Sequence, residues 1–489
     1  MKLILALVIL GCFCGASSGR ELIQAPAAIQ LSSTVSDGKH TIPEIIKIAK
    51  QNGVKIVILT DCDFMRWQYG LWPLRKIIKK TVENNSVSNY GIKRYLKEIE
   101  EAQKRNPDLA IIPGVESAPF YYWSGSLFEN NLKMHNWYKH MLVIGLEKAG
   151  DYRNLPSVSN NYGLLLPFAF KDVWRLWPIL ILIAGVLCFK RRKFNYKDLR
   201  GHTLGPCSRG WQAVGIVVIM FSLLFLFNNF PFCRYKYDQY HGERGIGPYQ
   251  NFIDYVNEKE GLTFWAHPEA EYIGRRGDVD IETNEYADHL LQARDYTGFT
   301  VFYEGYEKIG CPGGIWDEVL KEYCQNKRKA PVWAIGGLCF DQIGSLDENI
   351  KNLRTIFLMP RLTKTAALKA LREGRMYVVG GRRELRLDKF IIKDSFSETE
   401  GTMGNEIDLK GKAVIELSGH FLEGEAGGAD RVKIKLIRNG IVIKTFETAS
   451  PFDIEYEDDY FKEDEKIYYR LEINYSEGIL VSNPVFLKF

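Results

Sequence analysis

The stretch Gln30-Leu31-Ser32-Ser33-Thr34-Val35-Ser36-Asp37-Gly38 indicates the fold of this 489-residue chain. Apolar residues precede it, which predicts an N-terminal strand, and its last five residues have the composition of a tight turn. The amphipathic segment 43–51 that follows predicts a helix. A strand, a turn and a helix form the first unit of an α/β domain, with Gln30 and Ser32 at the end of the strand.

The same alternation continues outward from this stretch. Strands are predicted at 54–59, 109–112, 141–144, 262–265, 299–302 and 332–335, and helices at 90–104, 249–259 and 315–324. Short apolar strands separated by helices predict parallel βαβ units, and therefore an α/β sheet or barrel.

The pattern changes after residue 383. Short alternating segments predict strands with no helix between them, at 413–417, 432–437, 441–446, 468–474 and 480–485. Asn439-Gly440, between two of these strands, is a signal for a type I′ hairpin turn. The C-terminal part is therefore predicted to be a compact all-β module, of the sandwich type.

Three apolar segments indicate export and a membrane. Residues 1–19 have the positive start, short apolar region and small-residue end of a secretory signal, with lipoprotein processing at Cys12 as the alternative. The segments 176–189 and 211–232 are apolar, the second about 33 Å long as a helix, and the loop 190–210 between them is basic. This pattern predicts a membrane hairpin with a cytoplasmic loop, and a buried helical hairpin is the alternative. The hairpin places both soluble parts outside the cytoplasm, on a plasma or inner membrane.

The net charge of +4 is too small for a chain of this size to predict a nucleic-acid surface. Under the predicted topology, five of the nine cysteines lie where disulfides can persist, and their pairing stays open: Cys62, Cys233, Cys311, Cys324 and Cys339.

Residues that can bind a metal stand at several predicted strand ends. Asp61 and Cys62 follow 54–59, Glu116 follows 109–112, His140 precedes 141–144, His267 follows 262–265, and Cys339 and Asp341 follow 332–335. Because the ends of parallel strands converge in space, this arrangement is typical of a metal site. The histidines at 135, 202, 241, 289 and 420 have no such context and are predicted to lie on the surface.

Taken in order, these motifs resemble the PHP (polymerase and histidinol phosphatase) family over about residues 28–380. The motifs are Ser36-Asp37-Gly38, Thr60-Asp61-Cys62-Asp63, Pro113-Gly114-Val115-Glu116 and Ala266-His267-Pro268. The segment 367–378 and the C-terminal motifs Leu436-Ile437-Arg438-Asn439-Gly440, Tyr468-Tyr469-Arg470-Leu471 and Ser482-Asn483-Pro484 resemble its carbaryl-hydrolase branch. The resemblance implies a distorted (β/α)7 barrel, here interrupted by the transmembrane hairpin, then an immunoglobulin-like sandwich, with metal-dependent hydrolysis of phosphoesters.

Position by position, the metal-ligand set of the family is incomplete in this chain. Glu116, His140 and His267 match family ligands. Gln30 and Ser32 stand where the family has its opening histidines, Cys62 replaces another histidine, and Cys339 and Asp341 replace the last aspartate and histidine. The resemblance implies one divalent ion, zinc or manganese, with Asp61, Cys62 or Asp341 completing its shell, or no ion. Cysteine thiolates favour zinc. Arg275 and Arg276 are candidate phosphate contacts, with a solvated loop pair as the alternative.

Two functional interpretations follow, with a purely structural role for the barrel as a third. The first is a membrane-anchored extracytoplasmic protein with a degenerate metal site and a binding, pseudoenzyme role. The second is a residual one-metal phosphoesterase. The partner is the membrane together with a small phosphoester or a protein. The predicted divisions are a signal (1–19), two barrel halves (20–165 and 233–383) around the hairpin (166–232), and the β module (384–489).

Overall fold

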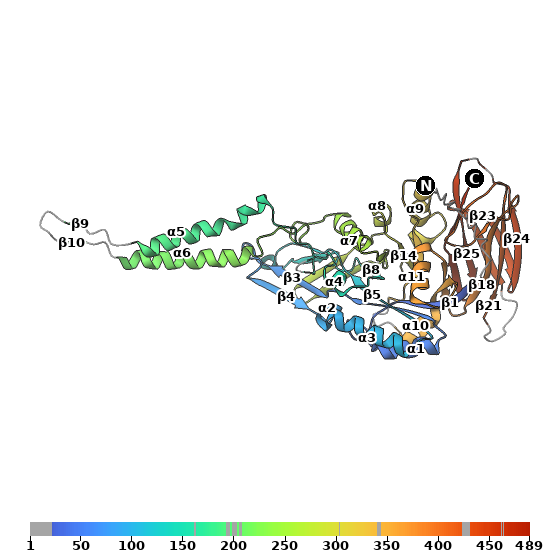
Figure 1. The fold of residues 1–489 in the computed structure, drawn as a ribbon, viewed down its shortest axis with the longest axis horizontal. Coiled ribbons are helices and arrows are strands. Elements are labelled where there is room, and N and C mark those ends of the chain that lie inside the picture. Colours follow the sequence, from blue (N-terminus) through green and yellow to red (C-terminus); the bar gives the residue numbers. More distant parts are fainter. Residues whose placement is uncertain are drawn as a thin grey trace, which may run out of the picture.

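The computed structural model describes residues 22–160, 163–191, 196–197, 203–204, 208–302, 304–339, 344–422, 431–460, 462 and 464–489. The predicted signal, Asp341 and most of the basic loop 190–210 lie outside these ranges. Figure 1 shows a body with a pair of helices, α5 and α6, projecting from one end and a β-rich module at the other.

Seven neighbouring strands form the centre of the α/β part, in the order β15-β14-β11-β8-β5-β2-β1. They are β1 (Ile23–Leu31), β2 (Ile56–Cys62), β5 (Ala110–Ser117), β8 (Met141–Ile144), β11 (Leu262–Trp265), β14 (Gly298–Phe302) and β15 (Trp333–Gly336). The two edges of this run approach each other, because the N–H of Leu338, just after β15, donates to the carbonyl of Ile29 in β1 (2.9 Å). Residues at the ends of distant strands are thereby brought together.

The expectation of an all-parallel run is wrong at β8. β8 runs antiparallel to both β5 and β11, whereas β1, β2 and β5 are mutually parallel, as are β11, β14 and β15. The chain travels from β5 to β8 through the short elements β6 (Tyr122–Ser124), η1 (Leu127–Glu129) and β7 (Lys133–His135) rather than through an α-helix. A parallel connection requires a crossover, which this excursion does not provide.

The helices cover the strands. They are α1 (Ile42–Gln51), α2 (Val87–Tyr90), α3 (Ile92–Arg105), α4 (Ala149–Arg153), α7 (Gly247–Glu258), α8 (His289–Gln292), α9 (Ile315–Cys324), α10 (Leu346–Asn352) and α11 (Lys364–Glu373). α1 begins after Thr41, whose backbone N–H donates to the Glu44 carboxylate (2.8 Å), and it buries Ile45 and Ala49 against the sheet.

Two hairpins extend the α/β part on the side of the projecting helices. β3 (Arg66–Gly70) pairs with β4 (Lys79–Glu83), and β12 (Tyr272–Arg276) and β13 (Val279–Thr283) join β7 and β6 in a four-stranded sheet. A separate cluster of buried aromatic and aliphatic residues, including Trp67, Trp123 and Trp137, packs beneath this sheet.

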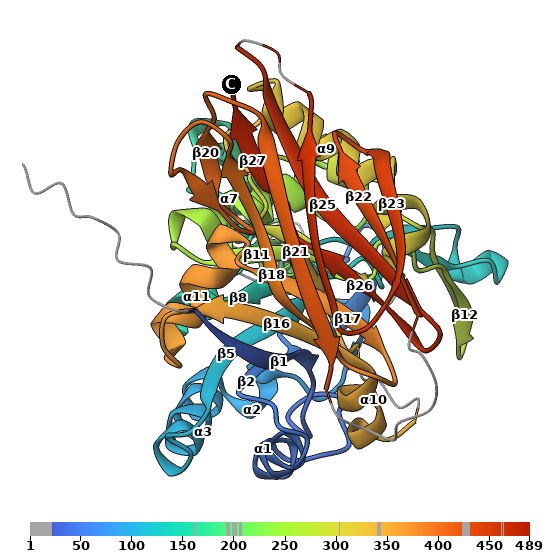
Figure 2. The same ribbon diagram turned by 90° about the vertical axis from the view of Figure 1, so that its right-hand side faces the viewer.

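The central sheet continues into the C-terminal module without a break. β1 pairs with β16 (Leu353–Met359), β16 with β17 (Met376–Gly381), and β17 with β26 (Gly478–Ser482) of the module. The other module strands are β18 (Leu385–Asp394), β19 (Glu400–Gly401), β20 (Glu406–Asp408), β21 (Ala413–Phe421), β22 (Arg431–Arg438), β23 (Ile441–Ala449), β24 (Phe452–Asp458), β25 (Lys466–Tyr475) and β27 (Val485–Lys488). These strands belong to two sheets, one containing β26-β25-β22-β23 and the other β19-β18-β21-β24, and their buried residues form one core. Figure 2 views the module from its end. The predicted hairpin turn is confirmed, since Asn439 and Gly440 both have positive φ.

The projecting pair consists of α5 (Trp177–Lys190), led by the 3-10 turn η2 (Phe170–Leu176), and α6 (Ser208–Asn229). The segments Phe170–Lys190 and Arg209–Asn229 are long and apolar enough to cross a membrane, with mean hydropathies of 1.8 and 2.2. Glycine permits their close contact, since a Cβ at Gly215 would lie 2.6 Å from the backbone nitrogen of Phe189.

Candidate metal centre

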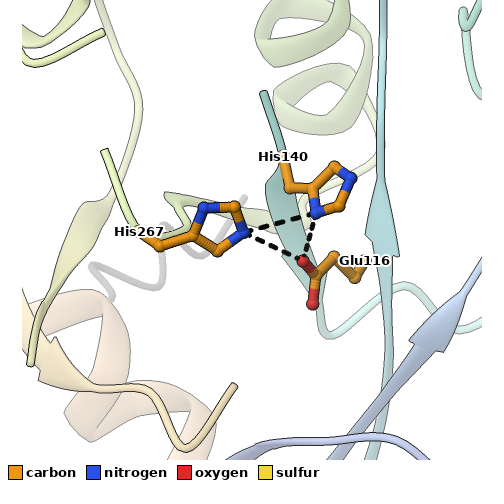
Figure 3. A group of neighbouring side chains, drawn as sticks. All are labelled: Glu116, His140 and His267. Atoms are coloured by element: carbon orange, nitrogen blue, oxygen red, sulfur yellow. Dashed lines mark hydrogen bonds and ion pairs between the residues drawn. The ribbon is translucent and has the colours of Figure 1, made fainter. Parts of the chain in front are cut away.

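Three side chains from three strand ends meet at one point (Figure 3): Glu116 of β5, His140 before β8 and His267 after β11. Glu116 Oε1 lies 2.6 Å from His140 Nδ1 and 3.5 Å from His267 Nε2. The two histidine nitrogens are 3.3 Å apart. This cluster, here called the triad, contains the three positions that match ligands of the family.

The backbone at the triad is strained. Gln30, His267 and Cys339, at the ends of β1, β11 and β15, have φ values of 64°, 35° and 37°. Non-glycine residues in this left-handed region cost free energy and cluster at functional sites. Backbone strain is therefore concentrated at the strand ends that surround the triad.

Tyr286 determines which nitrogen of His267 faces the triad. Its hydroxyl donates to the carbonyl oxygen of Ala266, so its oxygen is left to accept. It accepts from the backbone N–H of His140 (3.3 Å) and lies 3.3 Å from His267 Nδ1. Nδ1 must therefore carry the proton of neutral His267, and the Nε2 lone pair points into the triad. Partners of this kind fix metal-binding histidines. No sequence motif pointed to Tyr286.

Glu116 and His140 form a buried ion pair when no metal is bound. Burial alone would raise the pKa of Glu116, but His140 outweighs this effect by its charge and its hydrogen bond, and holds that pKa well below its usual range. Burial alone would lower the pKa of His140, but Glu116 reverses the effect and raises it. A metal ion at this point would therefore replace a proton on His140.

Gln30 donates a hydrogen bond to the carboxylate of the triad. Its Nε2 donates to Glu116 Oε2 (3.1 Å), which leaves Oε1 toward the histidines. The opposite end of its amide fits against Gly337, where a Cβ would lie only 2.3 Å from Gln30 Oε1. Gln30 thus positions Glu116 by a hydrogen bond.

Asp61 lies outside the triad and holds the turn that the sequence opens on. Its carboxylate accepts hydrogen bonds from the backbone N–H of Ser33 (2.7 Å) and from the hydroxyls of Ser33 (2.9 Å) and Ser36 (2.8 Å). The same turn requires Gly38, because a Cβ there would lie 2.1 Å from the carbonyl oxygen of Ser32. Asp61 as a ligand stays a prediction, and its visible contacts are structural.

Neither Cys62 nor Cys339 is among the three donor groups that meet in the described residues, and both stay predictions as ligands. Cys62 is buried and pairs in register with Glu116, and burial, with Asp37 and Glu116 nearby, raises the pKa of its thiol well above its usual range. Cys339 is close enough to Tyr286 to influence the pKa of that hydroxyl. Asp341 falls outside the described residues. No disulfide joins the cysteines that the structure describes.

Asp63 is a second acidic group beside the triad. Its backbone N–H donates to the carbonyl of Glu116 (2.9 Å), and its Oδ1 accepts from the N–H of Phe64 (2.6 Å). Burial raises the pKa of Asp63 to about 7. A carboxyl group with this pKa exchanges protons near neutrality. The sequence motif contained Asp63, but its spacing did not predict this environment.

The two candidate phosphate contacts differ. Arg275 pairs with Asp280 (3.6 Å), on the neighbouring strand of its own hairpin. Arg276 instead donates to the hydroxyl of Tyr138 (3.1 Å), whose ring lies 5.9 Å from that of His140. Only Arg276 is therefore linked by contacts to the triad.

The expectation that His289 lies on the surface is wrong. It packs against Trp265, Tyr249 and Tyr286, and burial lowers its pKa to about 4. It is a neutral packing residue behind His267 and Tyr286.

A cavity of about 1310 Å³ lies between the α/β part and the β module, and the triad does not line it. Glutamates dominate its wall, at positions 269, 271, 285, 304, 307 and 477. This charge disfavours a phosphate there.

The donor set of the triad fits one divalent ion. Around tetrahedral zinc, with bonds of about 2.0–2.1 Å, neighbouring ligand atoms lie roughly 3.3 Å apart. The separations of 3.3 and 3.5 Å at His267 agree with this value. Glu116 Oε1 and His140 Nδ1 lie closer than this, at 2.6 Å, because a hydrogen bond joins them.

No family model matches the chain, and no curated protein matches its sequence significantly. Among solved structures, it is similar to a two-domain protein from Bacteroides vulgatus containing a predicted PHP-like metal-dependent phosphoesterase (9% identity, 93% of this chain and 95% of that one, TM-score 0.33). It is also similar to a protein from Bifidobacterium adolescentis assigned to the metal-dependent phosphoesterases (15%, 65% and 89%, 0.27) and to an amidohydrolase from Chromobacterium violaceum with bound sulfate and no metal (13%, 64% and 86%, 0.26). The TM-scores are below 0.5, so conclusions about this chain rest on its own residues. The first of these neighbours contains a predicted member of the PHP-like metal-dependent phosphoesterases, the superfamily whose motifs the sequence of this chain resembles.

Proposed function

We propose that this chain is a membrane-anchored, PHP-type hydrolase of phosphoesters that binds a single divalent ion, zinc or manganese, at Glu116, His140 and His267. The observation that carries the proposal is the convergence of three donor atoms within 4.8 Å of one another. Two histidines, one carboxylate and an open position are the donor set of a catalytic zinc site. The ion would supply Lewis acidity to a phosphoryl oxygen and to water.

The residues of the chain supply the remaining tasks. Tyr286 and Gln30 orient His267 and Glu116 through the hydrogen bonds described above. Asp63, whose pKa burial raises to about 7, accepts a proton near neutral pH. Arg276, linked to His140 through Tyr138, offers a guanidinium to a phosphate entering from the β12–β13 side.

A binding role without turnover is the second candidate, and the environment of Asp61 favours it. Ser33 and Ser36 of the opening turn donate hydrogen bonds to the Asp61 carboxylate. Gln30 and Ser32 stand at the positions of two histidine ligands of the family that the sequence resembles. A second metal ion therefore lacks these donors. Two-metal sites stabilise both the attacking and the leaving oxygen of a displacement. The hydrolase proposal therefore predicts slow turnover.

The anchoring part of the proposal rests on α5 and α6. Their apolar faces are exposed, with Leu180 71% and Val217 65% accessible, a state that a bilayer would satisfy. We assign the loop 190–210 to the cytoplasm, and the (β/α)7 barrel and the immunoglobulin-like sandwich to the opposite side of a plasma or inner membrane. Labelling of cysteines introduced at 200 and 396 from each side of intact vesicles tests this assignment.

Hydrolysis of a chromogenic phosphodiester by the purified full-length protein tests the activity. Zinc- or manganese-dependent turnover should be lost in His267→Ala and kept in His135→Ala, a histidine that contacts Ser124 away from the triad. If the protein binds the metal and retains a phosphoester but hydrolyses neither phosphomonoesters nor phosphodiesters, the result would favour the binding role.

A further inference from the structure

The loop between β3 and β4, residues 71–78, exposes apolar side chains beside the base of the projecting helices. Trp72 is 80% exposed, Ile78 49% and Ile77 38%. An exposed tryptophan and two exposed isoleucines in one loop are costly in water unless another surface covers them.

Hydrogen bonds fix this loop to the end of α6. The Lys76 N–H donates to Asn228 Oδ1 (3.1 Å), and Asn228 Nδ2 donates to the carbonyl of Pro73 (3.1 Å). The Lys76 ammonium donates to the carbonyl of Phe230 (2.7 Å). The loop therefore lies at the level where the second candidate span ends.

Other exposed aromatic residues occur at the same level of the hairpin. Phe170 (92%) and Trp174 (82%) begin the first candidate span, and Phe230 (61%) follows the second. Aromatic side chains are enriched at the level of lipid headgroups. Trp72, in the β3–β4 hairpin of the α/β part, belongs to the same group of exposed aromatic residues.

The charge of the loop region matches the same environment. Between Trp72 and Lys80 the sequence has four basic residues, Arg75, Lys76, Lys79 and Lys80, and no acidic residue. Basic side chains near a bilayer gain from the phosphates of anionic lipids and can extend toward them while their stems stay in apolar surroundings.

We propose that the β3–β4 loop is a third membrane contact, in which Trp72, Ile77 and Ile78 enter the interface of an anionic phospholipid bilayer and the flanking lysines bind its phosphates. The inference rests on the proposed membrane hairpin. Two helices alone leave the tilt of the body relative to the bilayer unfixed, and a third contact displaced from their axis fixes it.

Photo-crosslinking in nanodiscs of phosphatidylcholine and phosphatidylglycerol in equal parts tests the proposal. Benzoylphenylalanine is placed singly in the full-length protein at Trp72, at Trp174 and at Phe396, which is 82% exposed in the β module. Phospholipid adducts are expected at positions 72 and 174, with at least about tenfold less at 396. Lys79→Glu with Lys80→Glu should reduce the adduct at 72 several-fold and leave that at 174 unchanged.

The three positions separate the possible failures. Adducts at 174 without adducts at 72 would overturn the third contact while keeping the hairpin in the membrane. No lipid adduct at either position would overturn the membrane hairpin, and the third contact with it. A crosslink from 72 to a protein would overturn the lipid contact in favour of a protein partner.

Discussion

At the scale of single residues, the triad depends on groups that were not candidates as ligands. Tyr286 assigns the proton of His267 through its hydrogen bonds, and Gln30 orients the Glu116 carboxylate. Sequence motifs identified which residues match ligands, but hydrogen-bond partners from remote segments have no spacing that identifies them.

Replacing Tyr286 by phenylalanine should weaken zinc binding about 10- to 100-fold, because His267 loses the acceptor that fixes its tautomer. Competition against a chromogenic chelator measures this change. Tyr296→Phe is the matched control, since Tyr296 is also buried but donates to Leu290. Equal losses in both variants would show a general packing effect.

Asp63→Asn should raise stability at pH 8. Burial raises the pKa of Asp63 to about 7, so wild-type protein loses stability as pH rises from about 4 to 7, when the folded state must ionise this group. The asparagine lacks this penalty, which is up to about 4 kcal/mol. Denaturant unfolding at pH 5 and pH 8 should show an advantage for the variant that is larger at pH 8. An advantage independent of pH would contradict the assigned environment.

At the scale of elements, the opening turn is held by close backbone approach. Gly38→Ala should cost about 2–4 kcal/mol, because its Cβ would meet the Ser32 carbonyl at 2.1 Å. Gly150→Ala is the control, since a Cβ there has no neighbour within 4 Å. Thermal unfolding of the two variants compares them, and equal midpoints would contradict the account of the turn.

Local patterns predicted many of the elements but not their pairing, and they missed the strands β3, β4, β12, β13, β16 and β17. The predicted strands 141–144 and 262–265 and the helix 315–324 have the observed bounds, because apolar periodicity follows burial. The segment 480–485 is two strands, β26 and β27, because Pro484 lacks the N–H that a continuous ladder needs. The direction of β8 and the four-stranded β12-β13-β7-β6 sheet depend on contacts between distant segments, which periodicity does not encode.

At the scale of the whole molecule, one buried ion pair joins the α/β part to the β module. Arg470 of β25 donates to both oxygens of Asp317 in α9 (2.8 and 2.6 Å), and both side chains are fully buried. Tyr468 donates to the same carboxylate (2.7 Å). These contacts and the shared sheet hold the two parts together.

Asp317→Asn should therefore destabilise the protein by about 3–5 kcal/mol, because it leaves the buried Arg470 charge unpaired. Lys412→Ala, which removes an exposed pair with Glu457, should cost at most about 1 kcal/mol. Denaturant unfolding followed by far-UV circular dichroism gives both values. A loss no larger than that of the surface variant would contradict the role of the pair.

The most direct test of the single-metal site is the metal content of the purified full-length protein. After loading with zinc or manganese and removal of free metal, elemental analysis should give one ion per chain, lost in His267→Ala and kept in His135→Ala. No bound ion, two ions per chain, or an ion that persists in His267→Ala would contradict a one-metal centre at Glu116, His140 and His267.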